Sequence, residues 1–475
     1  MFRNTPLAAA VLVAFATPLY AQTTTTPATG AQPASSASAS PSAANQAADS
    51  ATLPAVKVTG QSATPAEFAA DVSSIGAKVP TALRNVPGIT IGAAEGGQIG
   101  NNIYLDGFRD RGQYYRDTFN LESIDVLYGP SSLYFGRGST GGVINQVSKQ
   151  PTLKPRADVS VQAGTHDRYR TTVDLDTPIT STSAFRINAF GQDLGSSRDV
   201  MKSKDYGIAP EVKFGIGTPT EITLSALIQH NRDQPDYGVP ALNGHPAPVN
   251  RGTFYGFTDD RTIQDVQTLN ARIEHRFNDS LKLRNQTQFS HYSTEARATN
   301  AASVLTGPLP TSTALTNGNY TSIDPSKLVV KLQGKDRNVN DHSVYNSTDI
   351  EAKFNTGFIK HEVVAGVVDL SHETYSNQSF ATTTPGLPSN TIAIVPLVDP
   401  SYTTRPSNAK TVATNLAESS ANGIGVYAND TVSIGEPGRW WAACAGTATR
   451  RRFTTRSIRP RTPRRRTTSR ACAAA

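Results

Sequence analysis

The residues with the most evident chemistry lie in one short polar run, RDRGQYYRD, at residues 109–117. Its arginines and tyrosines are Arg109, Arg111, Arg116, Tyr114 and Tyr115. Guanidinium groups bind anions through paired hydrogen bonds, and both guanidinium groups and aromatic rings stack on flat ligands. The run therefore predicts a site for a ligand that is anionic and aromatic.

Extended segments flank this run and must position it. Ile103 to Phe108 (IYLDGF) predicts a strand that ends in an Asp-Gly turn. Residues 121–151 contain a short apolar strand, a Gly-Pro turn, five glycines between Gly129 and Gly142, and a second alternating strand. Such a density of glycine lets a backbone turn tightly and approach other surfaces closely.

The glycines also match a dinucleotide-binding fingerprint. Gly136 to Gly141 reads GRGSTG, and Asp158 follows at the spacing expected for an acid that binds ribose. That fingerprint must open a helix, whereas residues 142–150 are short and β-branched and are closed by Pro151. We therefore expect a strand here and no nucleotide site.

From about Ala157 onward, apolar and polar residues alternate as in β-strands. The expected strands are Arg168–Asp176, Ser183–Asp193, Pro210–Ile216, Glu221–Gln229, Asn270–Phe277, Leu281–Phe289, His342–Phe354, Phe358–Leu370 and Gly423–Val432. Phe185 and Ile187, for example, share the face opposite Arg186 and Asn188. The alternation indicates about ten half-polar strands, together with the initial segment near Ala157.

The connections between these strands differ in length along the chain. Asn278-Asp279 and residues 355–357 are short, whereas Asn231–Thr262, Thr294–Asp341 and Ser371–Ala421 are long and polar. Short turns on one rim and long loops on the other are typical of a transmembrane barrel, as is the low hydrophobic content of 37%. A soluble β-sandwich, which also alternates, is the less favoured alternative.

The segment at residues 103–151 closely resembles the plug domain of TonB-dependent outer-membrane siderophore receptors, and the chain looks most similar to the catecholate-type ferric siderophore receptors. The resemblance covers residues 50–438 and implies an all-β transmembrane barrel behind an N-terminal α+β plug. That family closes its barrel with 22 strands, so the resemblance implies that this chain is truncated at its C-terminal end.

The resemblance also implies roles for particular residues. Gln98 and the arginines and tyrosines of residues 109–117 correspond to the plug apex, which contacts the siderophore; the alternative is that these charges pair with carboxylates of the barrel wall. Leu53 to Gly60 (LPAVKVTG) resembles a TonB box. The expected TonB contacts are Leu53, Pro54, Ala55, Val56, Lys57 and Val58. The expected structural turn of the plug comprises Gly129, Pro130, Gly136, Arg137, Gly138, Gly141 and Gly142, with Arg137 paired to barrel acids.

The N-terminus predicts an exported protein. Arg3, the apolar run Leu7–Phe15 and Ala21 indicate a signal peptide over residues 1–21, for which a short buried helix is the alternative. Residues 22–52 are of low complexity and predict a flexible linker. The expected order continues with the TonB-box-like strand at 53–60, the plug at 61–153, the partial barrel at 154–438 and a tail at 439–475.

The tail has an unusual composition. It holds 11 arginines and no acid after Glu436, so the net charge of +7 arises there rather than in the body. Both cysteines, Cys444 and Cys472, also lie in the tail. Synonymous codons for residues 439–448, read in another frame, encode a barrel-like strand, so we expect an out-of-frame tail; a genuine basic, disordered tail is the alternative.

The resemblance implies TonB-dependent uptake of a ferric siderophore at the outer membrane of a Gram-negative cell. Its expected partners are TonB with ExbB and ExbD, the chelate and outer-membrane lipid, with no nucleic acid and a monomeric barrel. The chain is not expected to be an enzyme, and it needs no cofactor or metal site because iron arrives inside its chelate. A passive porin or binding protein, a truncated inactive product, and uptake of a hydroxamate siderophore, vitamin B12 or a glycan remain alternatives.

Overall fold

The computed structural model describes residues 103–112, 114–128, 142–307, 323–434, 438–457 and 470–474. The expected signal peptide, linker and TonB-box-like strand lie outside these ranges. Gln98 and most of the glycine turn, from Gly129 to Gly141, also lie outside them.

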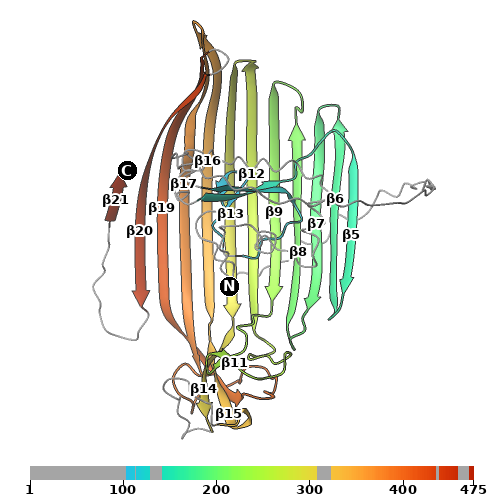
Figure 1. Ribbon diagram of the computed structural model, residues 1–475, viewed down its shortest axis with the longest axis vertical. Coiled ribbons are helices and arrows are strands. Elements are labelled where there is room, and N and C mark those ends of the chain that lie inside the picture. Colours follow the sequence, from blue (N-terminus) through green and yellow to red (C-terminus); the bar gives the residue numbers. More distant parts are fainter. Residues whose placement is uncertain are drawn as a thin grey trace, which may run out of the picture. The chain divides into compact units, whose positions relative to one another are not determined.

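A single antiparallel sheet dominates the described residues, and its strands are hydrogen-bonded in sequence order (Figure 1). The strands are β5 (Arg156–Gly164), β6 (Arg168–Thr180), β7 (Ser183–Gly195), β8 (Lys202–Phe214), β9 (Thr220–Asp233), β12 (Arg261–Asn278), β13 (Leu281–Arg297), β16 (Arg337–Thr356), β17 (Ile359–Thr383), β19 (Lys410–Ile434), β20 (Gly438–Ser457) and β21 (Arg470–Ala474). Among the described residues β5 and β21 form the two edges, so the sheet is not closed into a barrel.

The strands predicted from the sequence are confirmed, and most of them are longer than expected. Strand β17, for example, continues through Thr383 rather than ending at Leu370. The sheet has 12 strands where we expected about ten, because β20 and β21 pair within the segment that we interpreted as a tail. Pairing shows only that this backbone can extend the sheet and leaves the interpretation of its reading frame a prediction.

The two faces of the sheet differ in polarity. The inward face carries buried polar side chains such as Arg186, Asn188 and Gln288, each at most 4% exposed. The outward face carries exposed apolar side chains, including Ile228 and Leu269. The alternation is therefore confirmed, with the apolar side outside, which is the reverse of a soluble sandwich.

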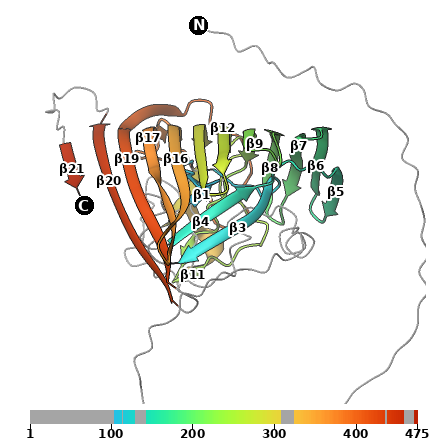
Figure 2. The same ribbon diagram turned by 90° about the horizontal axis from the view of Figure 1, so that it is seen from above.

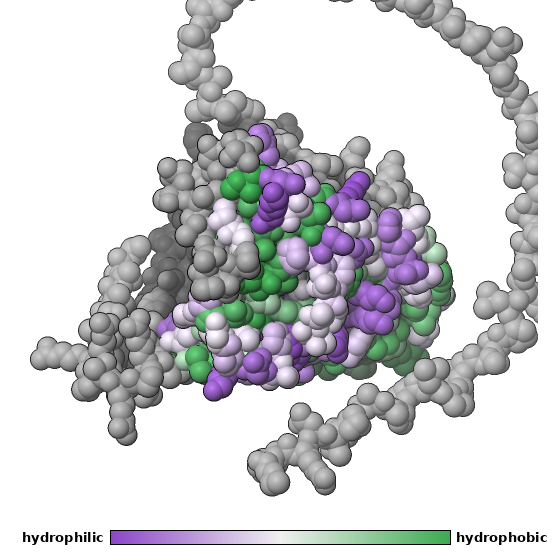
Figure 3. Space-filling view, turned by 90° about the horizontal axis from the view of Figure 1, so that it is seen from below, coloured by the Kyte–Doolittle hydropathy of each residue, from purple (hydrophilic) through white to green (hydrophobic). Residues whose placement is uncertain are grey.

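The apolar outward residues form a band across the strands. On β8, the outward positions from Tyr206 to Phe214 include Ile208 and Val212. At about 3.4 Å per residue and a tilt of about 40°, this stretch spans roughly 20 Å, close to the apolar band of a membrane barrel. Figure 3 views the molecule from the end that bears the long loops, where hydrophilic residues mix with hydrophobic ones and further hydrophobic residues show at the margin. No helix in the described part of the chain is long and apolar enough to cross a membrane.

A small mixed sheet precedes the large one along the chain. Its order is β2-β1-β4-β3, with β1 (Ile103–Leu105), β2 (Phe108–Arg109), β3 (Leu121–Tyr128) and β4 (Gly142–Ser148). Asp106 and Gly107, at φ 51° and 88°, make the tight turn between β1 and β2 that the Asp-Gly pair predicts. Gly142 begins β4, a strand, which agrees with the expectation that no helix follows the glycines.

The small sheet lies on the inner side of the large one, as the view from above shows (Figure 2). A hydrophobic core joins them. Ile103, Leu105 and Phe119 of the small sheet and its loops pack with Phe190 and Leu227 of the large sheet, which we call the wall. The rings of Phe119 and Phe190 are 4.7 Å apart. We call the small sheet and its loops the plug, because they fill the concave side of the wall.

The long connections lie on one rim and are shorter than expected, because the strands continue into them; they cover residues 234–260, 298–336 and 384–409. They contain β10 (Ala241–Leu242), β11 (His245–Pro246), β14 (Thr299–Thr306), η1 (Pro325–Lys327), β15 (Leu328–Gly334) and β18 (Ala393–Pro396). Strands β14, β15 and β18 form a sheet over a second core that includes Leu328, Val330 and Ile392. We expected polar loops, and the structure instead shows a folded cap built from three of them.

Candidate functional site

The site is the apex loop, residues 109–117, which links β2 to the segment before β3. The hairpin of β1 and β2 sets where the loop begins, since Asp110 N donates to Ile103 O at 2.9 Å. From there the chain crosses to the wall and returns to β3. The arginines and tyrosines that the sequence singled out are thus gathered in one loop, and they serve it in different ways.

Arg111 reaches across to the barrel wall. Its Nη1 lies 2.5 Å from Glu373 Oε2, and its Nε lies 3.8 Å from Asp341 Oδ2. The Arg111 side chain is 20% exposed, whereas both carboxylates are nearly buried. Burial acts to lower the pKa of Arg111, but the two carboxylates outweigh it and hold that pKa above its usual value. The expected alternative, pairing with wall carboxylates, is thus what Arg111 does here.

Arg116 and Tyr114 fold back onto their own loop. Arg116 Nε lies 2.6 Å from Asp110 Oδ2, and its guanidinium carbon lies 4.4 Å from the centre of the Tyr114 ring. The Tyr114 hydroxyl donates to Asp110 Oδ2 at 2.9 Å, and the ring stacks on Tyr292 of the wall at 5.6 Å. Tyr114 is 5% and Arg116 is 4% exposed. In this structure both side chains hold the loop together and have almost no surface left for a ligand.

The same burial affects ionisation. Desolvation raises the pKa of Tyr114 well above its usual value, with a further rise from the Asp110 carboxylate. For Arg116, burial opposes the charge, yet the pairing with Asp110 raises its pKa overall. The Arg116 guanidinium and the Tyr114 hydroxyl therefore both keep their protons across physiological pH.

Tyr115 is held by its backbone. Its N–H donates to Gln264 Oε1 at 3.0 Å, and its carbonyl accepts from Gln229 Nε2 at 2.7 Å and Asn231 Nδ2 at 3.3 Å. These wall amides fix the backbone of Tyr115, and its side chain is half-buried. Sequence reasoning missed Gln229, Asn231 and Gln264; their only signal was the polar face of the alternating strands.

Asp117 anchors the other end of the loop. Arg170 Nη2 and Nη1 of β6 lie 2.7 and 2.8 Å from the two Asp117 oxygens, a bidentate pair. The Arg170 guanidinium also covers the Phe190 ring at 4.9 Å. The acids of the RDRGQYYRD run, Asp110 and Asp117, are therefore structural anchors that the sequence analysis did not assign. Arg109 ends β2 and is partly exposed.

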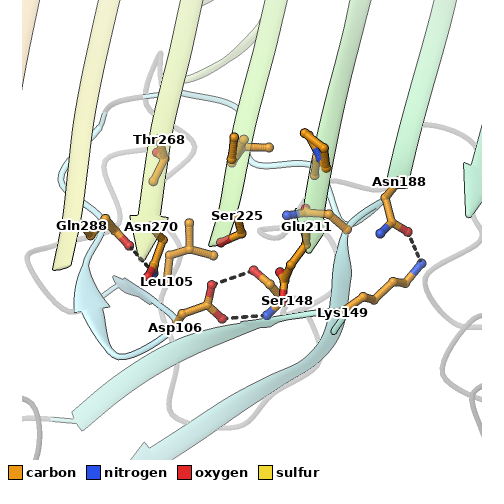
Figure 4. Close-up of a pocket in the computed structure, with 15 residues that line it drawn as sticks. Leu105, Asp106, Ser148, Lys149, Asn188, Glu211, Ser225, Thr268, Asn270 and Gln288 are labelled. Atoms are coloured by element: carbon orange, nitrogen blue, oxygen red, sulfur yellow. Dashed lines mark hydrogen bonds between the residues drawn. The ribbon is translucent and has the colours of Figure 1, made fainter. Parts of the chain in front are cut away.

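A small polar cavity of about 20 Å³ lies between the plug and the wall (Figure 4). Asp106 points toward it and binds Ser148, whose Oγ donates at 2.7 Å and whose N–H donates at 2.8 Å. Burial nevertheless raises the pKa of Asp106. The Lys149 ammonium of the plug reaches Asp174 of the wall at 3.0 Å. Around this cavity plug and wall therefore meet through hydrogen bonds and ion pairs, in contrast to the hydrophobic core that joins them elsewhere.

Comparison with known proteins agrees with this geometry. Residues 72–143 match the TonB-dependent Receptor Plug Domain family. The chain is 30% identical over 385 residues to the catecholate siderophore receptor Fiu of Escherichia coli K12, covering 74% of this chain and 48% of that protein. It is 34% identical over 232 residues to the probable TonB-dependent siderophore receptor PiuA of Acinetobacter baumannii, covering 44% and 31% respectively.

The fold is likewise similar to a solved structure. The open form of the ferric-catecholate import receptor Fiu from E. coli K12 superimposes with a TM-score of 0.69 at 25% identity, covering 86% of this chain and 64% of that one. In the sequence comparison, the chain spans about half the length of the Fiu protein (48%). With its plug docked on the polar inner face of an outward-apolar sheet, this chain carries the plug domain of the TonB-dependent receptors and is similar in sequence and fold to the catecholate siderophore receptor Fiu.

Proposed function

We propose that this chain serves the active uptake of a ferric siderophore across the outer membrane, driven through TonB. The observation that carries the proposal is the docking of the apex loop near the rim of the long loops. Arg111 meets the wall at Asp341, close to the start of β16, and at Glu373, toward the loop end of β17. A ligand entering from the loop side would meet this part of the plug first.

We assign ligand contact to the partly exposed members of the apex loop, Arg109, Arg111 and Tyr115, together with Gln98 as predicted from the sequence. A catecholate chelate is anionic and aromatic, so it would use both the cationic forks and the ring. The names of the two relatives, a catecholate receptor and a siderophore receptor, support this class of ligand. Tyr114 and Arg116 would support the loop from beneath.

We extend the proposal to the TonB-box-like segment and to the cargo. The segment Leu53–Val58 would pair with TonB as an added strand, with ExbB and ExbD supplying the energy. Iron would be cargo inside its chelate, so no bond is broken, no cofactor is needed, and the chain would act as a monomeric barrel in lipid. Pulling on the segment before the plug would draw the plug away from the wall and open the interface between them.

Deletion of residues 53–58 tests the proposal. The chain is produced in a Gram-negative strain that has TonB and lacks its own catecholate receptors, and radioactive iron is supplied as a catecholate chelate. We expect the deletion to abolish uptake and to leave binding of the chelate to cells unchanged. A deletion of equal length in the linker, residues 34–39, is the matched control and should preserve uptake.

Two results would contradict the proposal. Uptake that survives the deletion of residues 53–58 and the collapse of the proton gradient would indicate a passive porin. Absence of chelate binding, together with binding of a hydroxamate siderophore, vitamin B12 or a glycan in the same assay, would keep TonB-dependent transport and reassign the ligand.

A further inference from the structure

A row of histidines lies on the outward face of the sheet, away from the plug. The row consists of His230 on β9, His291 on β13, His342 on β16 and His372 on β17. On each strand the next outward residue toward the short-turn rim is apolar: Ile228, Phe289, Val344 and Leu370, all at least 41% exposed. The imidazoles therefore mark the edge of the apolar band on the side of the long loops, where water begins.

Two of these histidines face each other directly. His291 and His342 are Cα partners on neighbouring antiparallel strands. Their Nδ1 atoms are 3.0 Å apart, and their ring centres are 4.2 Å apart with the planes inclined by 25°. His230 and His372 differ, because each already pairs with an oxygen, His230 with Asp265 and His372 with Asn422, both at 2.7 Å.

A hydrogen bond satisfies the His291–His342 contact poorly. The N–H of an imidazole and the lone pair of its other nitrogen both lie in the ring plane, whereas these rings are stacked. Two protonated imidazoles at this distance would repel each other. A metal ion that accepts a lone pair from each nitrogen needs no shared proton and offsets the repulsion. The 3.0 Å between the two nitrogens is close to the roughly 3.3 Å between neighbouring imidazole nitrogens that are each about 2.0–2.1 Å from a tetrahedral Zn²⁺, and a rotation of each ring about its Cβ–Cγ bond would aim both lone pairs at one ion.

The charge nearby also favours a cation. Asp265 on β12 lies opposite Ser293 and is thus diagonal to His291 on the same outward face. Its Oδ1 binds His230 and its Oδ2 is 3.5 Å from the Ser293 hydroxyl. Across the described ranges, no three His, Cys, Asp or Glu side chains gather into a group that could hold a metal ion. The protein would therefore supply two ligands here, and water would supply the others.

We infer that His291 and His342 form a binding site for a transition-metal ion of the Zn²⁺, Ni²⁺ or Cu²⁺ class on the outer face of the sheet, at the boundary between lipid and water. Imidazole suits these ions, and Cu²⁺ should bind more tightly than Zn²⁺. The site stands apart from the apex loop and does not depend on the proposed transport.

The test uses the folded full chain in detergent, titrated with ZnCl₂ by calorimetry and with CuCl₂ by electron paramagnetic resonance. We expect one Zn²⁺ per chain, with affinity reduced at least about ten-fold in His291→Gln and in His342→Gln. The Cu²⁺ spectrum should show coupling to two imidazole nitrogens in the unaltered chain and to one in either variant. His372→Gln lies on the same face without a histidine partner and should leave both measurements unchanged.

A second measurement uses only the unaltered chain and so does not depend on whether a variant folds. Zn²⁺ should protect His291 and His342 from modification by diethyl pyrocarbonate and should leave His372 reactive. Equal Zn²⁺ affinity in all three variants, equal loss in His372→Gln, or equal reactivity of the three histidines with and without Zn²⁺ would overturn the site.

Discussion

Replacement of Arg111 by alanine should loosen the plug from the wall. Arg111 pairs with two carboxylates of the wall, at 2.5 Å from Glu373 and 3.8 Å from Asp341. Without it, two nearly buried carboxylates lose the guanidinium that pairs with both of them. The docked plug keeps both carboxylates poorly solvated, and they regain water only when it leaves, so their desolvation would favour separation.

The magnitude follows from the exposure of the groups. Removing one member of a fully buried pair typically costs about 3–5 kcal/mol. Arg111 is 20% exposed and Tyr345 still donates to Glu373 at 2.7 Å, so solvent and this hydroxyl absorb part of the penalty. We therefore expect a loss of about 2–3 kcal/mol in the free energy that holds the plug against the wall.

Limited proteolysis of the folded chain in detergent measures this loss, because cleavage of the plug reports the fraction that is undocked. Arg111→Ala should raise the cleavage rate of the plug by roughly 30- to 160-fold, the factor that corresponds to about 2–3 kcal/mol. Arg156→Ala is the matched control: its pair with Asp158 is about half exposed, and it should change the rate less than about three-fold.

A second substitution separates charge from packing. Adding Glu373→Gln to Arg111→Ala removes the charge of one of the two carboxylates that Arg111 pairs with and should restore most of the protection. If Arg111→Ala cleaves no faster than Arg156→Ala, or if the double variant is no better protected than Arg111→Ala, then the ion pair does not hold the plug and the reasoning is refuted.

Three further predictions concern the outer face, the cap and the apex loop. Ile273→Arg, in the outward apolar band, should make the free energy of folding into lipid vesicles less favourable by about 2–4 kcal/mol. Glu295→Arg, beyond the band, should change the same free energy by at most about 1 kcal/mol. Arg405→Leu leaves Asp336 without its cation, 2.7 Å away, and should expose the loop cap to protease while β12 and β13 stay protected. Tyr114→Phe should cost about 1 kcal/mol of plug stability in urea titrations and Tyr114→Ala about 3–5 kcal/mol; equal costs would show that the ring stack contributes nothing.

Local patterns in the sequence were enough to locate the strands. The alternation around Phe185 and Arg186 could be read directly, because successive side chains in a strand point to opposite faces whatever the surroundings. The turn at Asp106-Gly107 was also predictable, since few residue pairs adopt two positive φ angles. The ends of the strands were not, because strands such as β17 continue beyond the apolar band through polar residues that the alternation does not mark.

The folded cap is the clearest part that the sequence did not disclose. Strands β14, β15 and β18 come from two different long connections and pair across them. Their short apolar stretches gain a core only when residues as far apart as Tyr255 and Leu397 meet, where the tyrosine hydroxyl donates to the backbone at 2.5 Å. Such pairing depends on distance in space, which no local pattern encodes.

The sequence by itself determined the class of fold and the loop that matters, because side-chain alternation, glycine-rich turns and the grouping of arginines with tyrosines are local properties of the chain. Only the tertiary structure decided how that loop is divided. It buries Tyr114 and Arg116 against Asp110, and it turns Arg111 to acids that lie far along the chain on the wall. Whether a charged side chain is an anchor or a free contact depends on which opposite charges surround it, and these are brought together only when the sheet curves around the plug.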